Sequence, residues 1–152
     1  MHRKIMVFLT GIFFVGSIFA GISFADMKED AFALVKKGNE YIQKNGVEKA
    51  AKAFQEKEFK KGELYLFAYD YKGTCLAQGA KPQFVGKNLW NLKTPTGTYL
   101  FRDLTATAKK GGGWMEYQWM NPYKKKLMTK ESYIMPIEGK EIYVGCGFFK
   151  EQ

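Results

Sequence analysis

Apolar residues near the N-terminus recur at a helical spacing. From Asp26 to about Lys44, apolar or small residues follow the i, i+3, i+4, i+7 pattern of a helix with one buried face: Ala31, Leu34, Val35, Gly38, Tyr41 and Ile42. Asn45-Gly46 interrupts this pattern with a pair suited to a left-handed helix end. A second, shorter helix is predicted from the spacing of Val47, Ala50, Ala51 and Phe54.

The pattern becomes that of β-strands after Gly62. The run 64–69 is aromatic and apolar and predicts a central strand, and 74–78 predicts a second strand after a turn. The stretch 79–98 has the prolines and glycines of a loop, while 99–109 has apolar residues at helical spacing. Beyond the triple glycine 111–113, strands are predicted at 114–120, 127–136 and 141–149. Helices gathered apart from the strands indicate an α+β domain.

The first 25 residues have the pattern of a secretory signal peptide. A short basic start, His2-Arg3-Lys4, precedes an apolar run from Ile5 to Ala20, and Ser23-Phe24-Ala25 offers the small residues of a cleavage site. We therefore expect residues 1–25 to be removed and 26–152 to form one domain in the periplasm that does not span the membrane. The alternative is that the segment stays attached as an N-terminal anchor.

The charge of the chain favours a solvated basic surface over a nucleic-acid site. The formal net charge is +9, and without Arg3 and Lys4, 22 basic residues stand against 15 acidic ones, a net charge of +7. The lysines are spread along the sequence rather than gathered in one stripe, and an exported protein rarely meets nucleic acid, so no nucleic-acid partner is expected. The densest basic run, Lys124-Lys125-Lys126, falls in a predicted turn, where such runs more often serve solubility.

The absence of histidine from the predicted mature chain weakens the hypothesis of an enzyme. The only histidine is His2, so residues 26–152 contain no Ser-His-Asp or Cys-His nucleophile system and no histidine for a zinc site or a c-type haem. Acidic pairs such as Glu29/Asp30 lie in no recognisable pocket context. We expect no catalytic residues, no metal and no cofactor.

Five short motifs in order resemble the single Cache domain family of type 2. They are the run from Leu64 to Asp70 continued by Leu76-Ala77-Gln78-Gly79, then Val85-Gly86-Lys87-Asn88-Leu89, the stretch Gly113-Trp114-Met115-Glu116-Tyr117-Gln118-Trp119-Met120-Asn121-Pro122, Lys130-Glu131-Ser132-Tyr133, and Val144-Gly145-Cys146-Gly147-Phe148. The resemblance runs from about Asp30 to Lys150.

This resemblance implies a fold and a function. The fold would be a long N-terminal helix packed on a five-stranded antiparallel PAS-like sheet in the order 2-1-5-4-3. The function would be extracytoplasmic sensing of a small organic acid, a C2–C4 carboxylate such as acetate, propionate, lactate or pyruvate. A stand-alone module would need a membrane receptor or kinase as its partner, and we leave monomer and dimer open.

The candidate ligand-binding residues combine a cation, hydrogen-bond donors and aromatic walls. Charge-assisted hydrogen bonds from Lys130, with the hydroxyls of Tyr117 and Tyr133, suit a carboxylate that leaves water. Trp119 and Trp114 could wall its apolar end, although strand alternation puts Trp114 on the opposite face unless a bulge re-aims it. The further candidates are Gln78, at a position where relatives often have histidine, and Arg102, the only arginine after the signal peptide.

Each candidate also has a plain structural interpretation. Aromatic residues in a sheet usually form core, a strand lysine usually faces solvent, and Arg102 could simply pair with a surface acid. A ligand-free envelope interaction protein with the same fold therefore remains the alternative function. For the two cysteines, the implied strand order places Cys75 and Cys146 two strands apart, about 9–10 Å, which predicts two free, mostly buried thiols.

Overall fold

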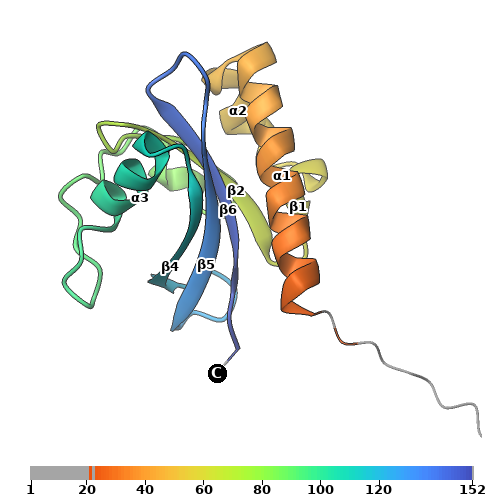
Figure 1. Ribbon diagram of the computed structural model, residues 1–152, viewed down its shortest axis with the longest axis vertical. Coiled ribbons are helices and arrows are strands. Elements are labelled where there is room, and N and C mark those ends of the chain that lie inside the picture. The colour runs from red at the N-terminus through yellow and green to blue at the C-terminus, as the bar shows by residue number, and fades with distance from the viewer. Residues whose placement is uncertain (1–20, 22, 152) are drawn as a thin grey trace, which may run out of the picture.

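The computed structural model describes residue 21 and residues 23–151, and in these the chain forms three layers (Figure 1). The long helix α1 (Phe24–Asn45) and the short helix α2 (Val47–Ala53) lie on one side of an antiparallel sheet. Helix α3 (Leu100–Lys109) lies on the other side. The predicted signal peptide falls largely outside the described residues. No helix in the described part of the chain is both long and apolar enough to cross a membrane.

Helix α1 begins at a capping box and presents the predicted apolar face to the sheet. The Ser23 hydroxyl accepts a hydrogen bond from the Asp26 N–H at 3.2 Å, and the Asp26 carboxylate accepts one from the Ser23 N–H at 3.1 Å. Buried residues along the helix include Ala31, Leu34, Val35, Gly38, Asn39 and Ile42. A Cβ atom at Gly38 would lie 2.7 Å from the Leu66 Cδ1, so the missing side chain lets the helix approach the central strand closely.

The sheet contains the five predicted strands in the predicted arrangement, with one small addition. The five are β2 (Leu64–Asp70), β3 (Cys75–Gln78), β4 (Gly113–Met120), β5 (Leu127–Pro136) and β6 (Ile142–Phe149). β3 pairs with β2, β2 with β6, β6 with β5 and β5 with β4, all antiparallel, which confirms the order 2-1-5-4-3. The prediction of five strands is corrected to six, because the two-residue strand β1 (Lys60–Lys61) also pairs with β2 through the tight turn at Gly62.

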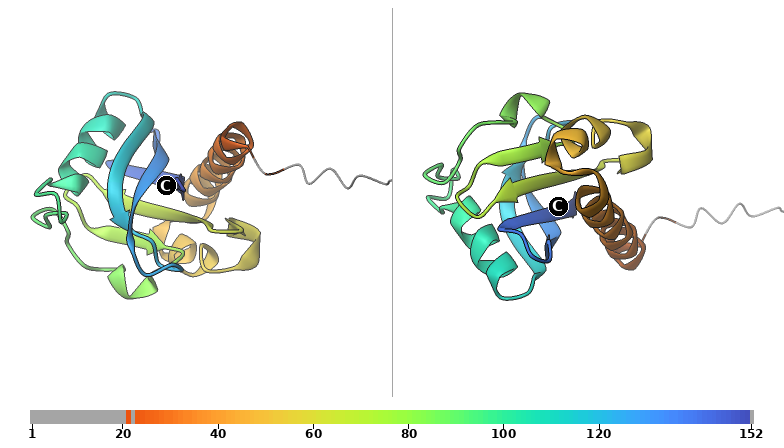
Figure 2. Two further views of the ribbon diagram at one scale, coloured as in Figure 1. Left: turned by 90° about the horizontal axis from the view of Figure 1, so that it is seen from below. Right: turned by 90° about the horizontal axis from the view of Figure 1, so that it is seen from above.

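Two hydrophobic cores form because alternate residues of each strand face opposite sides of the sheet. The core beneath α1 and α2 takes Leu64, Leu66, Ala68, Val144 and Cys146 from the strands. The core beneath α3 takes Tyr65, Phe67, Tyr69, Tyr143 and Phe149. Figure 2 shows the sheet twisting between the two helical layers. Both cysteines are free and buried, as predicted: Cys146 lies in the first core and Cys75 in the second.

The segment between β3 and β4 covers the second core. It contains the short 3-10 helix η2 (Pro82–Phe84) and α3; a similar 3-10 turn, η1 (Lys57–Phe59), precedes β1. After α3 the chain turns back into β4 through the triple glycine. Gly112 has φ 87°, and a Cβ there would lie 2.3 Å from the Ile134 carbonyl oxygen, so this position requires glycine.

Candidate ligand-binding site

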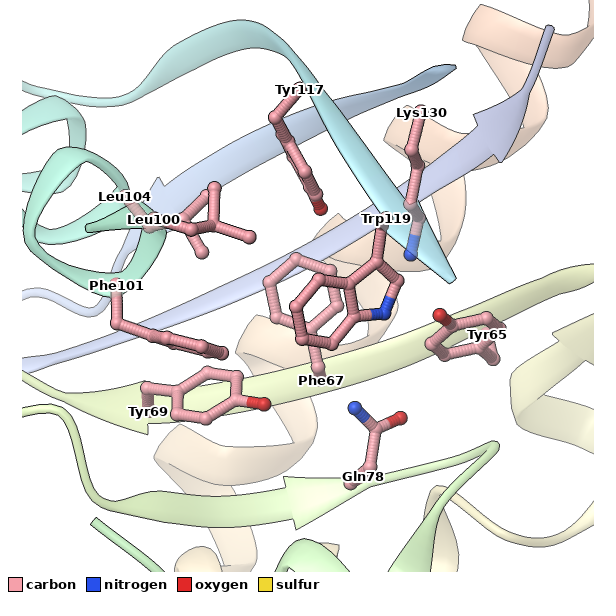
Figure 3. Close-up of a pocket in the computed structure, with 10 residues that line it drawn as sticks. All are labelled: Tyr65, Phe67, Tyr69, Gln78, Leu100, Phe101, Leu104, Tyr117, Trp119 and Lys130. Carbon is pink, nitrogen blue, oxygen red and sulfur yellow. The ribbon is translucent and has the colours of Figure 1, made fainter. Parts of the chain in front are cut away.

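A small cavity, lined mainly by aromatic and aliphatic side chains with a few polar groups, lies between α3 and the sheet (Figure 3). Its lining residues come from β2, β4 and β5, from the last residue of β3, and from α3. The ten are Tyr65, Phe67, Tyr69, Gln78, Leu100, Phe101, Leu104, Tyr117, Trp119 and Lys130. The volume open to the centre of a water molecule is about 10 Å³. This is room for about one water molecule, so a larger ligand requires side chains to move outward.

Strand alternation and register bring these side chains together. Tyr65, Phe67 and Tyr69 are alternate residues of β2, and Tyr117 and Trp119 are alternate residues of β4, so each set shares one face. Lys130 on β5 pairs in register with Tyr117 on one side. On its other side it pairs with Phe149, whose ring belongs to the same core.

Lys130 is a buried cation that lacks an anionic partner. Its side chain is only 1% exposed, and within the described residues no carboxylate oxygen lies within 4 Å of its Nζ. The Nζ instead lies over aromatic rings, 4.0 Å from the ring centroid of Tyr65 and 5.2 Å from that of Phe67. Burial lowers the pKa of Lys130 below its ordinary value, because the charged form loses its hydration.

Several neutral hydrogen-bond donors line the same cavity as the lysine. The Tyr117 hydroxyl forms a 2.9 Å hydrogen bond with the buried Ser132 hydroxyl, and burial raises the pKa of Tyr117, so the phenol keeps its proton. The Gln78 carbonyl oxygen accepts a 3.1 Å bond from the Ala80 N–H, which leaves the amide NH₂ to donate. In Figure 3 this amide, the Tyr69 hydroxyl and the Tyr117 hydroxyl point toward a common space. A site that combines an ammonium with neutral donors, and has no carboxylate among its lining residues, is complementary to an anion.

Two glycines of β6 make room for this arrangement. A Cβ at Gly145 would lie 2.4 Å from the Phe67 ring, and one at Gly147 would lie 2.1 Å from the Ser132 Oγ. Without side chains at these positions, Phe67 can lie across β6 and Ser132 can reach the Tyr117 hydroxyl. The closing Val-Gly-x-Gly motif thus has a steric role beneath the cavity.

A larger hollow lies beside the cavity and shares Leu100 and Tyr117 with it. Its volume, measured in the same way, is about 330 Å³. Its other lining residues are mainly polar and come from the loop before α3, from Asp103 of α3, from β4 and from Thr129 of β5. Leu100 and Tyr117 border both spaces and therefore separate the cavity from the hollow.

Comparison with known proteins identifies the family. The model of the family described as Single Cache domain 2 matches residues 26–152. The chain belongs to this family. Its members include the extracytoplasmic sensor domains of kinases and chemotaxis receptors, so the domain is a sensory module.

Relatives and solved structures agree with this assignment. The Cache domain described here is 32% identical over 85 residues to the sensor histidine kinase MctS of Rhizobium johnstonii, covering 56% of this chain and 18% of MctS. A methyl-accepting chemotaxis protein of Vibrio parahaemolyticus superposes with a TM-score of 0.68 and 26% identity, over 80% of this chain and 87% of that structure. A Cache chemosensory domain solved for its recognition of carboxylic acid has the same fold, with a TM-score of 0.69 and 17% identity over 82% and 93% of the two chains.

Four of the seven predicted ligand residues meet in the cavity of this Cache domain. They are Gln78, Tyr117, Trp119 and Lys130. That they bind a ligand stays a prediction, but their shared location follows from the sheet. Strand alternation placed Tyr117 and Trp119 on one face correctly.

Tyr133 and Trp114 lie on the opposite face, so our prediction that they join the cavity is corrected. Tyr133 is three residues from Lys130 on a regular strand and therefore points the other way. Its ring packs edge-on against Phe32 of α1 at 4.8 Å and against Trp114 at 5.3 Å. Trp114 also carries the Lys28 ammonium 4.9 Å from its ring, and no bulge turns it toward α3.

Arg102 lies outside the cavity and holds the loop before α3. Its guanidinium donates to the Trp90 carbonyl oxygen at 3.2 Å and to the Asn91 side-chain oxygen at 2.6 Å, and it stacks on Tyr99 at 3.9 Å. These contacts position the loop and place this candidate ligand residue outside the cavity. The surface acid that we considered as its partner is also absent from these contacts.

The sequence analysis missed the part of the cavity that β2 and α3 supply. Tyr65, Phe67 and Tyr69 occupy every second position of the central strand, and this regular alternation of aromatic residues was a usable signal. Leu100, Phe101 and Leu104 carried no comparable signal, because the first turns of a short amphipathic helix look like any other core-facing segment.

Proposed function

We propose that this Cache domain is an exported sensory module that binds a short organic acid, of the C2–C4 class, through its carboxylate. The observation that carries this proposal is the buried Lys130 ammonium, which shares its cavity with neutral donors and has no carboxylate partner among the described residues. A bound carboxylate would satisfy Lys130, while Trp119 and the side chains of α3 would surround the apolar end. The solved Cache chemosensory domain that recognises carboxylic acid supports this ligand class by analogy of fold alone.

Ligand entry would take place at the wall between the cavity and the larger hollow. The cavity is too small for even a two-carbon acid, so Leu100 and its neighbours on α3 would move outward as the ligand enters. This movement of α3 relative to the sheet would be the output of the sensor. The chain covers 18% of the length of MctS, so transfer of the signal to a separate membrane receptor or kinase is part of the proposal.

The experiment is a thermal-shift and calorimetric screen of residues 23–152 against acetate, propionate, lactate and pyruvate, with protein purified in buffers free of carboxylic acids. A ligand at 100 times its Kd should stabilise the fold by about 2.7 kcal/mol. Tyr117→Phe should weaken binding by roughly five- to tenfold, because it removes one donor. Tyr133→Phe is the matched control, because it removes the same atom from the opposite face and should leave the affinity unchanged.

A ligand-free interaction module is the second candidate, and the small volume of the cavity favours it. The same screen distinguishes the two proposed functions. If none of these acids shifts the melting temperature or releases heat, the carboxylate proposal fails and the interaction module becomes the better explanation.

A further inference from the structure

One end of the domain gathers exposed apolar side chains and lysines. The exposed residues are Met120 at the end of β4, Tyr123 in the turn between β4 and β5, and Leu127 at the start of β5, with exposed fractions of 41%, 48% and 36%. Phe24, which is 54% exposed at the start of α1, adds to them where the N-terminal segment is retained as an anchor. Lys124, Lys125 and Lys126 lie in the same turn. Figure 1 shows the start of α1, the β4–β5 turn and the C-terminus at this one end, which we name the basic end.

The turn holds its lysines in a fixed conformation. The buried Asn121 side-chain oxygen accepts hydrogen bonds from the N–H groups of Tyr123 and Lys124 at 2.8 and 3.0 Å. Lys125 has φ 55° and is the only non-glycine residue with a positive φ in the described part of the chain. Glycine or asparagine would adopt this conformation at lower cost, so a lysine here retains its charge at the expense of backbone strain.

Positive charge on the basic end is only partly neutralised. Lys124 pairs with Glu151 at 2.8 Å, whereas Lys125 and Lys126 form no ion pair with any described residue. Partial burial lowers the pKa of Lys81, and repulsion from the charge of nearby Lys125 lowers it further. Next to the turn lies a groove of about 460 Å³ with both apolar and charged lining residues. The apolar ones include Leu64 and Phe148, and the charged ones are Lys61, Lys124, Asp30, Glu63 and Glu151.

We propose that the basic end docks on an anionic phospholipid surface. Lysines interleaved with exposed aromatic and aliphatic side chains are the composition that binds the interface of such membranes. A protein partner fits less well, because protein interfaces are depleted of lysine and enriched in arginine, and Arg102 lies outside this end. If the apolar run 5–20 is retained as an N-terminal anchor, it also leads into α1 at the basic end.

Vesicle co-sedimentation tests this inference. Residues 23–152 contain the Ser23 cap, both cores and all six strands, so this fragment keeps every contact described above and leaves out the apolar run. It should bind vesicles of phosphatidylcholine with about one quarter phosphatidylglycerol and should dissociate at about 0.5 M salt. Binding that is equal on pure phosphatidylcholine, or absent from both, overturns the proposal.

Matched lysine variants locate the surface. Replacing Lys124, Lys125 and Lys126 by Gln should lower the partition coefficient by roughly 100-fold, at about fivefold for each lysine. The control replaces Lys109, Lys110 and Lys140 by Gln, which makes the same charge change at the opposite end of β4 and β5. Equal losses for the two triple variants would show that overall charge, rather than this surface, drives binding.

A single substitution separates binding from folding. Lys125→Gly removes one charge and also relieves the positive φ, so it should weaken vesicle binding about fivefold while the melting temperature stays the same or rises. Unchanged vesicle binding by this variant would contradict a role for the turn.

Discussion

Replacing Lys130 by Met should make the domain more stable and remove its binding of acids. Methionine has nearly the length of lysine and an unbranched, apolar chain, so it can occupy the same space in the core without a charge. Lys130 is 1% exposed and has no carboxylate within 4 Å among the described residues. The substitution therefore removes a buried charge without leaving a partner unpaired.

The magnitude follows from two opposing contributions. Removing an ammonium from water costs several kcal/mol after the protein relaxes. The rings of Tyr65, Phe67 and Phe149, whose centroids lie 4.0, 5.2 and 5.3 Å from the Nζ, recover part of that cost through cation–π attraction. We expect Lys130→Met to raise the free energy of unfolding by about 1–3 kcal/mol.

The difference in the free energy of unfolding between Lys130→Met and the native protein should depend on pH. The pKa of Lys130 in the folded protein is lowered from 10.5, so between the folded value and 10.5 the unfolded chain binds more protons than the folded chain. The stability of the native sequence therefore rises with pH across this window. The difference in the free energy of unfolding between the variant and the native protein is constant below the folded pKa of Lys130. It becomes smaller as the pH rises above that pKa.

Urea denaturation of both proteins between neutral and alkaline pH measures this difference. Lys110→Met is the control, because Lys110 is exposed and forms no ion pair with the described residues. Two results would refute the reasoning that Lys130 is a costly buried cation: a lower free energy of unfolding for Lys130→Met than for the native protein, or a difference between the two that stays the same at high pH. If the variant still binds organic acids with native affinity, Lys130 is not the ligand group.

Three further predictions concern the fold and its processing. Gly147→Ala should lower the free energy of unfolding, measured by urea denaturation, by about 3 kcal/mol. The reason is that its Cβ would lie 2.1 Å from the Glu131 carbonyl oxygen and from the Ser132 Oγ. A change within about 0.5 kcal/mol would mean that β5 and β6 separate easily. Both thiols should stay unlabelled by a thiol reagent in the native protein and react after unfolding without a reductant. Both are buried, and burial raises the pKa of Cys146 to about 12 and that of Cys75 to about 11. An unfolded protein that does not react would indicate a disulfide. The mass of the exported protein should correspond to a chain that begins at Asp26, whereas an intact N-terminus would favour the anchor.

Much of the fold was predictable because its signals are local. The apolar face of α1, the turn at Asn45-Gly46 and the strand pattern after Gly62 each arise within a few residues. The same holds for Tyr117 and Trp119, whose spacing of two residues fixes a common face. Applied equally to Lys130 and Tyr133, three residues apart, this rule would have separated them, but the motif they share suggested a common site.

What the sequence by itself determined was the set of main helices and strands and, within a strand, which residues share a face. Only the tertiary structure decided that α3 lies over the face that carries Lys130, while α1 covers Tyr133 and Trp114. It also decided that Arg102 contacts the loop before α3, and that the cavity is very small. The physical reason is that a residue's face follows from its neighbours in sequence, whereas the layer that covers that face depends on packing between segments far apart in the chain.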